Sequence, residues 1–369
     1  MSESVPIRRL LRHPVANSES LEASALVVGA IVFVVASLAA LVAFWGRSLP
    51  ISGRDSIGQF VALGSAVAAV VVLVAARTLI ASSTRAGRLV ARGLDVAGAR
   101  LRWFDIAALA LAHGVIALLG WVAVADVLAK SFSGAVVFTF SAVVLGGAAV
   151  AVSAYVVFLS AVKLTPMLMS LVLAVFLITG IFASMLSATD PLWWQKNLST
   201  LGMSGDISSL AFNITLIVAG VIVTTIAHYA TAAIAVAEPR LQRGRAAVRT
   251  ALVVLGLLLA GVGLFPLDRF FTAHNVCATG MVVVFVTLVL ALPRLVPSIS
   301  RTFVLLGYVF VGVVVVLAVL FVTGYYTLTA VELVAGLIVF SWLIVFLRTT
   351  GAMVREADAD AATTIVDRA

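Results

Sequence analysis

Ten long apolar segments, separated by short polar ones, limit the folds that this chain can adopt. Most of them run for about 20 residues with almost no charge, which is the length that an α-helix needs to cross a bilayer. Of the 369 residues, 63% are apolar and 11% are charged, whereas soluble domains average about 45–50% and about 25%. We therefore expect an integral membrane protein.

The apolar segments predict helices and exclude a membrane β-barrel. Barrel strands alternate in polarity over about 10 residues, but most of these segments are continuously apolar for roughly twice that length. The expected fold class is all-α, a polytopic bundle of about ten transmembrane helices. They cover approximately residues 23–45, 57–76, 104–128, 134–161, 167–187, 207–235, 251–265, 276–292, 303–323 and 328–347.

Basic residues follow an alternating pattern that predicts the orientation. Arginine and lysine gather on every second connection, which is typical of cytoplasmic loops. Both termini are then cytoplasmic, in a multi-pass protein of the plasma membrane whose first helix is an uncleaved anchor. The net charge of +8 indicates contact with membrane lipids and with anionic headgroups at the cytoplasmic loops, not nucleic acid. Oligomeric state stays open.

The chain divides into four parts. Residues 1–22 form a cytoplasmic N-terminal segment, 23–165 a four-helix membrane region, 166–348 a six-helix domain, and 349–369 a disordered cytoplasmic tail. Within the second part, the basic loop 82–103 is amphipathic. It is either a helix lying in the membrane interface or a solvated connector.

Two polar segments, residues 188–213 and 263–280, interrupt the apolar pattern on the expected outer side. Both are rich in charge and aromatic rings, and charged groups entering membrane helices are functional candidates. We expect them to form an outer site together with the start of the last helix. Its candidate residues are Asp190, Trp193, Trp194, Lys196, Asn213, Asp268, Arg269, His274, Asn275 and Glu332.

Local roles can be assigned to several of these residues. Asp190 and Pro191 have the cap and first-turn types that begin a helix, so a short interfacial helix should carry Trp193 and Trp194. The tryptophans either anchor this helix in the interface or roof a cavity. Asp268 can pair with Arg269 or with His274, and His274 and Asn275 are expected to cap the eighth helix.

Motifs of metal, nucleophilic and nucleotide chemistry are missing from the sequence. The histidines are scattered, and no HxxxH, HExxH, CxxC, GxSxG or Walker pattern occurs, so we expect no metal site and no cofactor. His113 and His228 lie inside apolar segments. Each is either a neutral histidine bonded to a neighbouring helix or part of a proton relay or ligand site.

Several pieces of the last six helices resemble a known family. They are Asp190-Pro191, then Leu198-Ser199-Thr200-Leu201-Gly202, Phe212-Asn213 with Gly220, Gly263-Leu264-Phe265-Pro266 with Asp268, and His274 ahead of Ala278. In this order they resemble an uncharacterised bacterial and archaeal family of polytopic membrane proteins, distantly similar to eukaryotic DRAM-type proteins.

The resemblance covers roughly residues 167–347 and leaves the first four helices unmatched. Trp193 fits the aromatic residue that follows the first proline in the family, whereas Asn275 stands where a second histidine can occur. The resemblance implies an integral membrane fold and a shared outer site but no known reaction.

Three functions are compatible with these residues. The first is handling or transport of a lipid or small molecule through a polar cavity in the outer leaflet. The second is a membrane-embedded lipid hydrolase or transferase, in which His274 acts as general base and Asp268 orients it. The third is a structural or accessory subunit without chemistry of its own. The missing motifs favour the first over the second.

Overall fold

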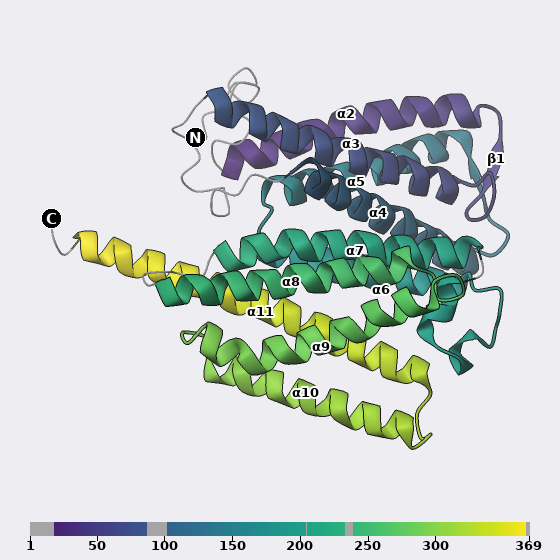
Figure 1. Cartoon of the computed structure of the whole chain (residues 1–369). Coiled ribbons are helices and arrows are strands. Elements are labelled where there is room, and N and C mark those ends of the chain that lie inside the picture. Colours follow the sequence, from purple (N-terminus) through teal and green to yellow (C-terminus); the bar gives the residue numbers. More distant parts are fainter. Residues whose placement is uncertain (1–17, 87–101, 204, 233–238, 367–369) are drawn as a thin grey trace. The chain divides into compact units, whose positions relative to one another are not determined.

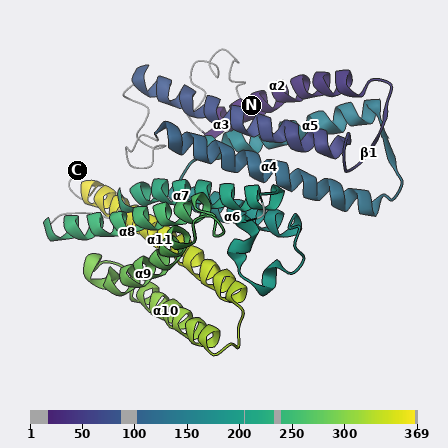
Figure 2. The same ribbon diagram turned by 45° about the vertical axis from the view of Figure 1, so that its right-hand side comes forward.

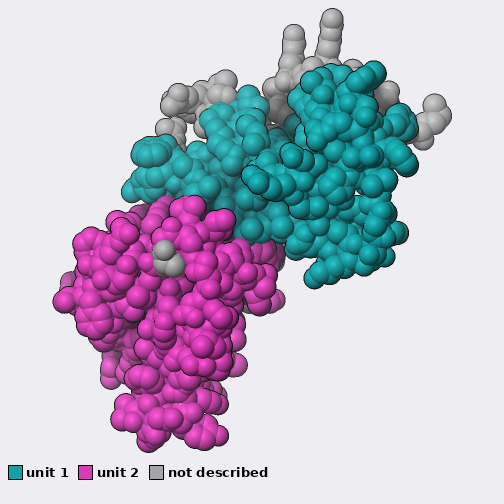
Figure 3. All heavy atoms as spheres, turned by 90° about the vertical axis from the view of Figure 1, so that its right-hand side faces the viewer, with its two compact units in different colours: residues 1–95, 102–164 teal, residues 96–101, 165–369 magenta. Residues whose placement is uncertain are grey.

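The computed structural model describes residues 18–86, 102–203, 205–232 and 239–366 and is mostly helical. Ten helices in these residues are long and apolar enough to cross a membrane, which confirms the predicted all-α polytopic bundle. The chain forms two compact units, shown in different colours in Figure 3. Unit 1 comprises residues 1–95 and 102–164, and unit 2 comprises residues 96–101 and 165–369.

Unit 1 is a four-helix bundle. Helix α3 packs against both α4 and α5, and α2 packs along α5 (Figures 1 and 2). Two short strands pair antiparallel at one end of these helices, with Leu49 opposite Val137. The elements are α2 (Ser18–Phe44), β1 (Ser48–Pro50), α3 (Ile57–Ala86), α4 (Trp103–Ser131), β2 (Val136–Phe138) and α5 (Thr139–Val162).

The strand pair was not predicted, because residues 134–138 were assigned to the fourth apolar helix. In the structure α5 begins only at Thr139, whose hydroxyl donates to the carbonyl oxygen of Phe44 at 2.9 Å. Gly134 has a positive φ of 74°, a conformation that suits glycine and ends regular structure before the strand. The apolar residues of β2, Val136–Phe138, are indistinguishable by composition from the start of a membrane helix.

Unit 2 is a ring of six helices. Each helix packs against the next one in the chain, and α11 closes the ring by packing against α6 and α7. The helices are α6 (Pro166–Leu186), α7 (Ile207–Ala232), α8 (Pro239–Leu264), α9 (Phe271–Leu295), α10 (Arg301–Val322) and α11 (Leu328–Val366).

Small residues and aromatic side chains hold the six helices of unit 2 together. Gly220 of α7 faces Gly256 of α8, and a Cβ on either residue would collide with the carbonyl of the other. Close approach of this kind is how membrane helices gain packing contacts when lipid removes the hydrophobic drive for association. On the opposite side, Trp342 of α11 stacks on Phe346 and meets Phe285 of α9 and Phe303 of α10.

Helices α8 and α9 begin earlier than their apolar residues indicated. We placed their starts near residues 251 and 276, but they begin at Pro239 and Phe271. The first turns of α8 carry Arg243, Arg245 and Arg249, whose long stems can lie along a helix while the charged ends reach water. Hydropathy alone therefore underestimates the length of such a helix.

The C-terminal tail and the basic loop 82–103 are the two segments outside the predicted membrane helices for which we had specific expectations. The tail from residue 349 was expected to be disordered, but α11 continues as far as Val366. Extending an existing helix avoids the cost of nucleation, and the alanines of this tail have the highest helix propensity. In the basic loop 82–103, α3 reaches Ala86 and α4 begins at Trp103. The rest of this loop lies almost entirely outside the described residues.

Candidate functional site

The polar connection between α6 and α7 contains two short 3₁₀ helices, η1 (Trp193–Gln195) and η2 (Leu198–Gly202). It lies at the same end of unit 2 as the turn from α8 to α9 and the turn from α10 to α11 (Figure 1). The two polar segments singled out in the sequence therefore meet at one end of the ring of helices.

The tryptophan segment is shorter than the interfacial helix that we expected. The carboxylate of Asp190 accepts a hydrogen bond from the backbone N–H of Leu192 at 2.9 Å, which forms a tight turn of the kind that aspartate favours. The tryptophans then lie in η1, which is a single 3₁₀ turn. Trp193 is half-buried, whereas Trp194 is 49% exposed, so the two rings have different surroundings.

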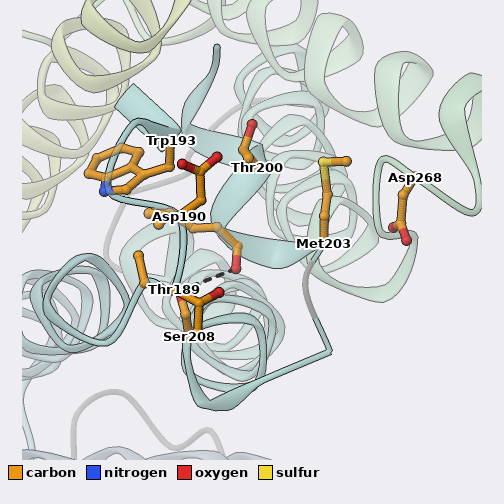
Figure 4. Close-up of a pocket in the computed structure, with 9 residues that line it drawn as sticks. Thr189, Asp190, Trp193, Thr200, Met203, Ser208 and Asp268 are labelled. Carbon is orange, nitrogen blue, oxygen red and sulfur yellow. Dashed lines mark hydrogen bonds between the residues drawn. The ribbon is translucent and has the colours of Figure 1, made fainter. Parts of the chain in front are cut away.

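A pocket of about 290 Å³ opens beside this turn. Asp190 and Trp193 lie on one side of it and Asp268, from the α8–α9 turn, lies on the other (Figure 4). None of its lining residues is basic. They are Ala188, Thr189, Asp190, Trp193, Thr200, Leu201, Met203, Ser208 and Asp268.

Both carboxylates of the pocket have a basic side chain beside them. Lys196 Nζ lies 3.0 Å from Asp190 Oδ2, and Arg269 Nε lies 3.9 Å from Asp268 Oδ2. Both basic side chains are mostly exposed, at 61% and 72%, so these pairs contribute little to stability. The Leu192 N–H and the Lys196 ammonium lower the pKa of Asp190 below its usual value. Because that usual value is already far below neutral, the carboxylate is charged at neutral pH.

Three helices each attach one polar side chain to η2, which forms a wall of the pocket. Glu332 of α11 accepts from the backbone N–H of Leu198 at 2.5 Å. His274 of α9 bonds the hydroxyl of Ser199 at 3.0 Å, and Asn213 of α7 donates to the carbonyl oxygen of Gly202 at 3.1 Å. These three residues come together at η2, but none of them lines the pocket.

The hydrogen bonds of His274 define its tautomer. Its Nδ1 lies 2.8 Å from the carbonyl oxygen of Phe265, which can only accept, so Nδ1 carries the proton. A neutral ring then has Nε2 as an acceptor for the Ser199 hydroxyl. Both ring nitrogens are occupied, and Asp268 is not the group that orients this histidine.

The expectation that His274 and Asn275 cap a helix is wrong. Helix α9 begins at Phe271 after Phe270 as its N-cap, so both residues are already inside the helix. Asn275 donates to the carbonyl oxygen of Phe271 one turn earlier. A cap four residues into a helix is impossible, because the N–H groups there already have helical partners.

Hydroxyl groups that the sequence analysis did not assign connect the pocket to the helix ends. Thr189 donates to Asp206 Oδ2 at 2.9 Å, and Asp206 Oδ1 accepts from the backbone N–H of Ser209 at the start of α7. Ser208 and Ser184 bond each other across α6 and α7 at 3.0 Å. Motif residues 198–202 were marked by the family resemblance, but no role was given to Ser199 or Thr200.

Neither of the two intramembrane histidines lines the pocket. His113 is in unit 1, where its ring bonds the Leu109 carbonyl and the Ser160 hydroxyl. His228 is exposed and bonds the Thr224 carbonyl of its own helix. In the part of the chain that the structure describes, no group of three or more metal-binding side chains occurs.

Comparisons with known proteins add no assignment. No family model, no curated protein and no solved structure matches this chain. The resemblance of residues 167–347 to an uncharacterised membrane family therefore stays a prediction.

Proposed function

We propose that this integral membrane protein binds a small polar molecule, or the polar headgroup of a lipid, in the pocket of unit 2 and handles or transports it. The observation that carries the proposal is the pocket itself, with carboxylates, hydroxyls and an indole ring on its walls. A volume of about 290 Å³ is near the lower limit for small-molecule pockets. It suits a headgroup or a small solute, with any lipid chains left in the membrane.

The alternative of a lipid hydrolase is less well supported. Ser199 and His274 have the hydroxyl-to-imidazole distance of a nucleophile and its base. An acyl-transfer site also needs N–H donors aimed at the developing oxyanion, but the N–H of Leu198, beside Ser199, is bonded to the Glu332 carboxylate. That N–H is therefore not free to bind an oxyanion, so these groups are better suited to hold the wall of a binding site.

A pocket-filling variant tests the proposal. We expect Ala188→Trp, which puts an indole into the pocket, to abolish binding of a probe that the wild type binds. The probes are dihexanoylphosphatidylcholine, dihexanoylphosphatidylglycerol, choline and glycerol, measured by native mass spectrometry on the full chain. Ala123→Trp, on the exposed face of α4 in unit 1, is the matched control. An equal response of all three proteins, including no binding by any of them, contradicts the proposal.

The orientation in the plasma membrane is part of the same proposal. The pocket end faces outward, and the opposite end of unit 2 carries the exposed side chains of Arg243, Arg294, Arg301 and Arg348, which suit anionic headgroups of the inner leaflet. After replacement of Cys277 by alanine, a cysteine at position 196 should react with an impermeant maleimide from outside. A cysteine at position 243 should react only after permeabilisation, and the reverse pattern would overturn the orientation.

A further inference from the structure

If the proposed function holds, the charges on the pocket wall indicate the chemical class of its ligand. The pocket has two carboxylates in its walls, Asp190 and Asp268, and no basic lining residue. Asp190 is ionised at neutral pH, and the Leu192 N–H and Lys196 lower its pKa still further. Lys196 and Arg269 lie beside these carboxylates but do not line the pocket. The charges that a ligand meets on the pocket wall are therefore negative, which favours a cationic group over an anionic or a neutral one.

The aromatic wall adds a second feature that selects a cation. Trp193 lies beside Asp190 in the pocket wall (Figure 4). An indole ring attracts an ammonium through its negative face, and tryptophan does so best among the aromatic residues. A carboxylate next to an aromatic ring is therefore suited to a primary or quaternary ammonium.

The protein already supplies an ammonium to this carboxylate. Lys196 Nζ lies 3.0 Å from Asp190 Oδ2, on a side chain that is 61% exposed. An exposed pair of this kind is weak, so a ligand that also meets the ring and Asp268 can displace the lysine. Lys196 then acts as a competitor that occupies Asp190 until the ligand arrives.

We infer that the pocket of unit 2 is a binding site for an ammonium group, either on a lipid headgroup or on a free small molecule, and that Lys196 competes with it for Asp190. The inference rests on the proposed function and adds the class of ligand. It also sets the sign of the Lys196 effect, because removal of a competing cation strengthens the binding of a cationic ligand and weakens that of an anionic one.

The experiment measures binding by isothermal titration to the full chain in nanodiscs of phosphatidylglycerol, which contain no ammonium lipid. Choline is compared with its neutral isostere 3,3-dimethyl-1-butanol and with dihexanoylphosphatidylcholine. We expect choline or the choline lipid to bind at least about tenfold more tightly than the isostere, since hydrogen bonds and contacts to charged groups contribute about 1.5–3 kcal/mol. Preference for free choline or for the lipid identifies the source, and either result supports the inference.

Variants of the pocket residues and of Lys196 sharpen the test. We expect Asp190→Asn and Asp268→Asn each to weaken choline binding by about tenfold, and Trp193→Leu by about threefold to fivefold. Lys196→Gln should strengthen it by about threefold. Lys163→Gln, at an exposed lysine that follows α5 in unit 1, is the matched control and should change nothing.

Three results would overturn the inference. They are equal affinity for choline and the isostere, weaker binding in Lys196→Gln, or no binding of any ammonium probe. Blocking by Ala188→Trp separates these failures from failure of the proposed function. If the isostere or phosphatidylglycerol binds and Ala188→Trp prevents it, the pocket is a binding site of another class. If no probe responds to Ala188→Trp, both proposals are wrong.

Discussion

Two buried histidines, one in each unit, make almost the same hydrogen bonds in different surroundings. His113 bonds a carbonyl oxygen at 2.7 Å through Nδ1 and the Ser160 hydroxyl at 2.8 Å through Nε2. His274 does the same with Phe265 and Ser199 at 2.8 and 3.0 Å. Their exposed fractions are 7% and 3%.

The difference lies in what each histidine connects. The carbonyl partner of His113 is one turn earlier in α4, and Ser160 is on the neighbouring helix α5. The bond thus joins two membrane helices. His274 instead joins α9 to the end of α8 and to η2, next to the pocket. The same types of hydrogen bond join two packed helices in unit 1 and hold a pocket wall in unit 2. The role of such a histidine therefore depends on the elements that it connects.

The largest expected effect separates the two histidines directly. His113→Ala and His274→Ala should each lower the free energy of unfolding by about 1–3 kcal/mol, because each leaves buried polar partners unsatisfied. Only His274→Ala should also weaken choline binding, by about tenfold, because η2 loses its contact with α9. Thermal unfolding and choline titration on both variants check this. Equal loss of binding in the two variants would remove the distinction between the units.

The next largest effect concerns the carboxylate that binds η2 from α11. Glu332→Ala should lower the free energy of unfolding by about 1–2 kcal/mol, since the Leu198 N–H loses its acceptor. Glu332→Gln keeps an acceptor oxygen and should lose less than half of that. Chemical unfolding in detergent micelles compares the two variants. A glutamine variant as unstable as the alanine variant would show that the charge, and not the hydrogen bond, is what η2 requires.

A smaller effect is expected at Asn213, with a matched bond in unit 1 as reference. Asn213→Leu removes the donor to the Gly202 carbonyl and should cost about 1 kcal/mol. Ser153→Ala removes the acceptor of the Trp121 indole N–H, 2.8 Å away, at a similar cost. Proteolysis within residues 188–206 should increase only in Asn213→Leu. Increased cleavage there in both variants would argue that η2 responds to global stability alone.

How much of this site the sequence could predict depends on the kind of contact. Asp190, Trp193 and Asp268, three of the residues singled out in the sequence, line the pocket. They can be picked out because charged and aromatic residues between membrane helices stand out against the apolar segments. The bond from Glu332 to the Leu198 N–H spans 134 residues and ends on a backbone group. Almost every residue has a backbone N–H, so the residue type at position 198 does not indicate that this N–H binds Glu332. His274 and Ser199 were visible, but their pairing depends on how the helices pack.

The fold, too, has features that the sequence predicts and features that it does not. Composition and the length of apolar segments predict ten membrane helices, because lipid permits few alternatives. Strand β2 escapes prediction because Val136–Phe138 is as apolar as the helix that follows it. Strand β1, Ser48–Pro50, is too short to show the alternation that indicates a strand. The early start of α8 escapes it because arginine stems allow a charged sequence to remain helical near the membrane surface.

The smallest expected effect is on the pH dependence of the pocket. Because the pKa of Asp190 is lowered in the folded protein, its charged form stabilises the fold and the site at neutral pH. That contribution is lost only as the pH falls through the lowered value, below about pH 4. The difference in choline affinity between wild type and Asp190→Asn should therefore stay constant from pH 8 to pH 5. A difference that shrinks between pH 7 and 5 would show that Asp190 is not held in its ionised form.

Closure of the ring by α11 has a consequence for biosynthesis. The helix that supplies Glu332 to η2 and packs back onto α6 is the last of the ten to leave the ribosome. Until it inserts, Leu198 has no partner from α11 and the first helix of unit 2 has an open flank. The binding wall is thus finished only at the end of translation, and a chain that stops before residue 328 carries the pocket residues without the helix that secures them.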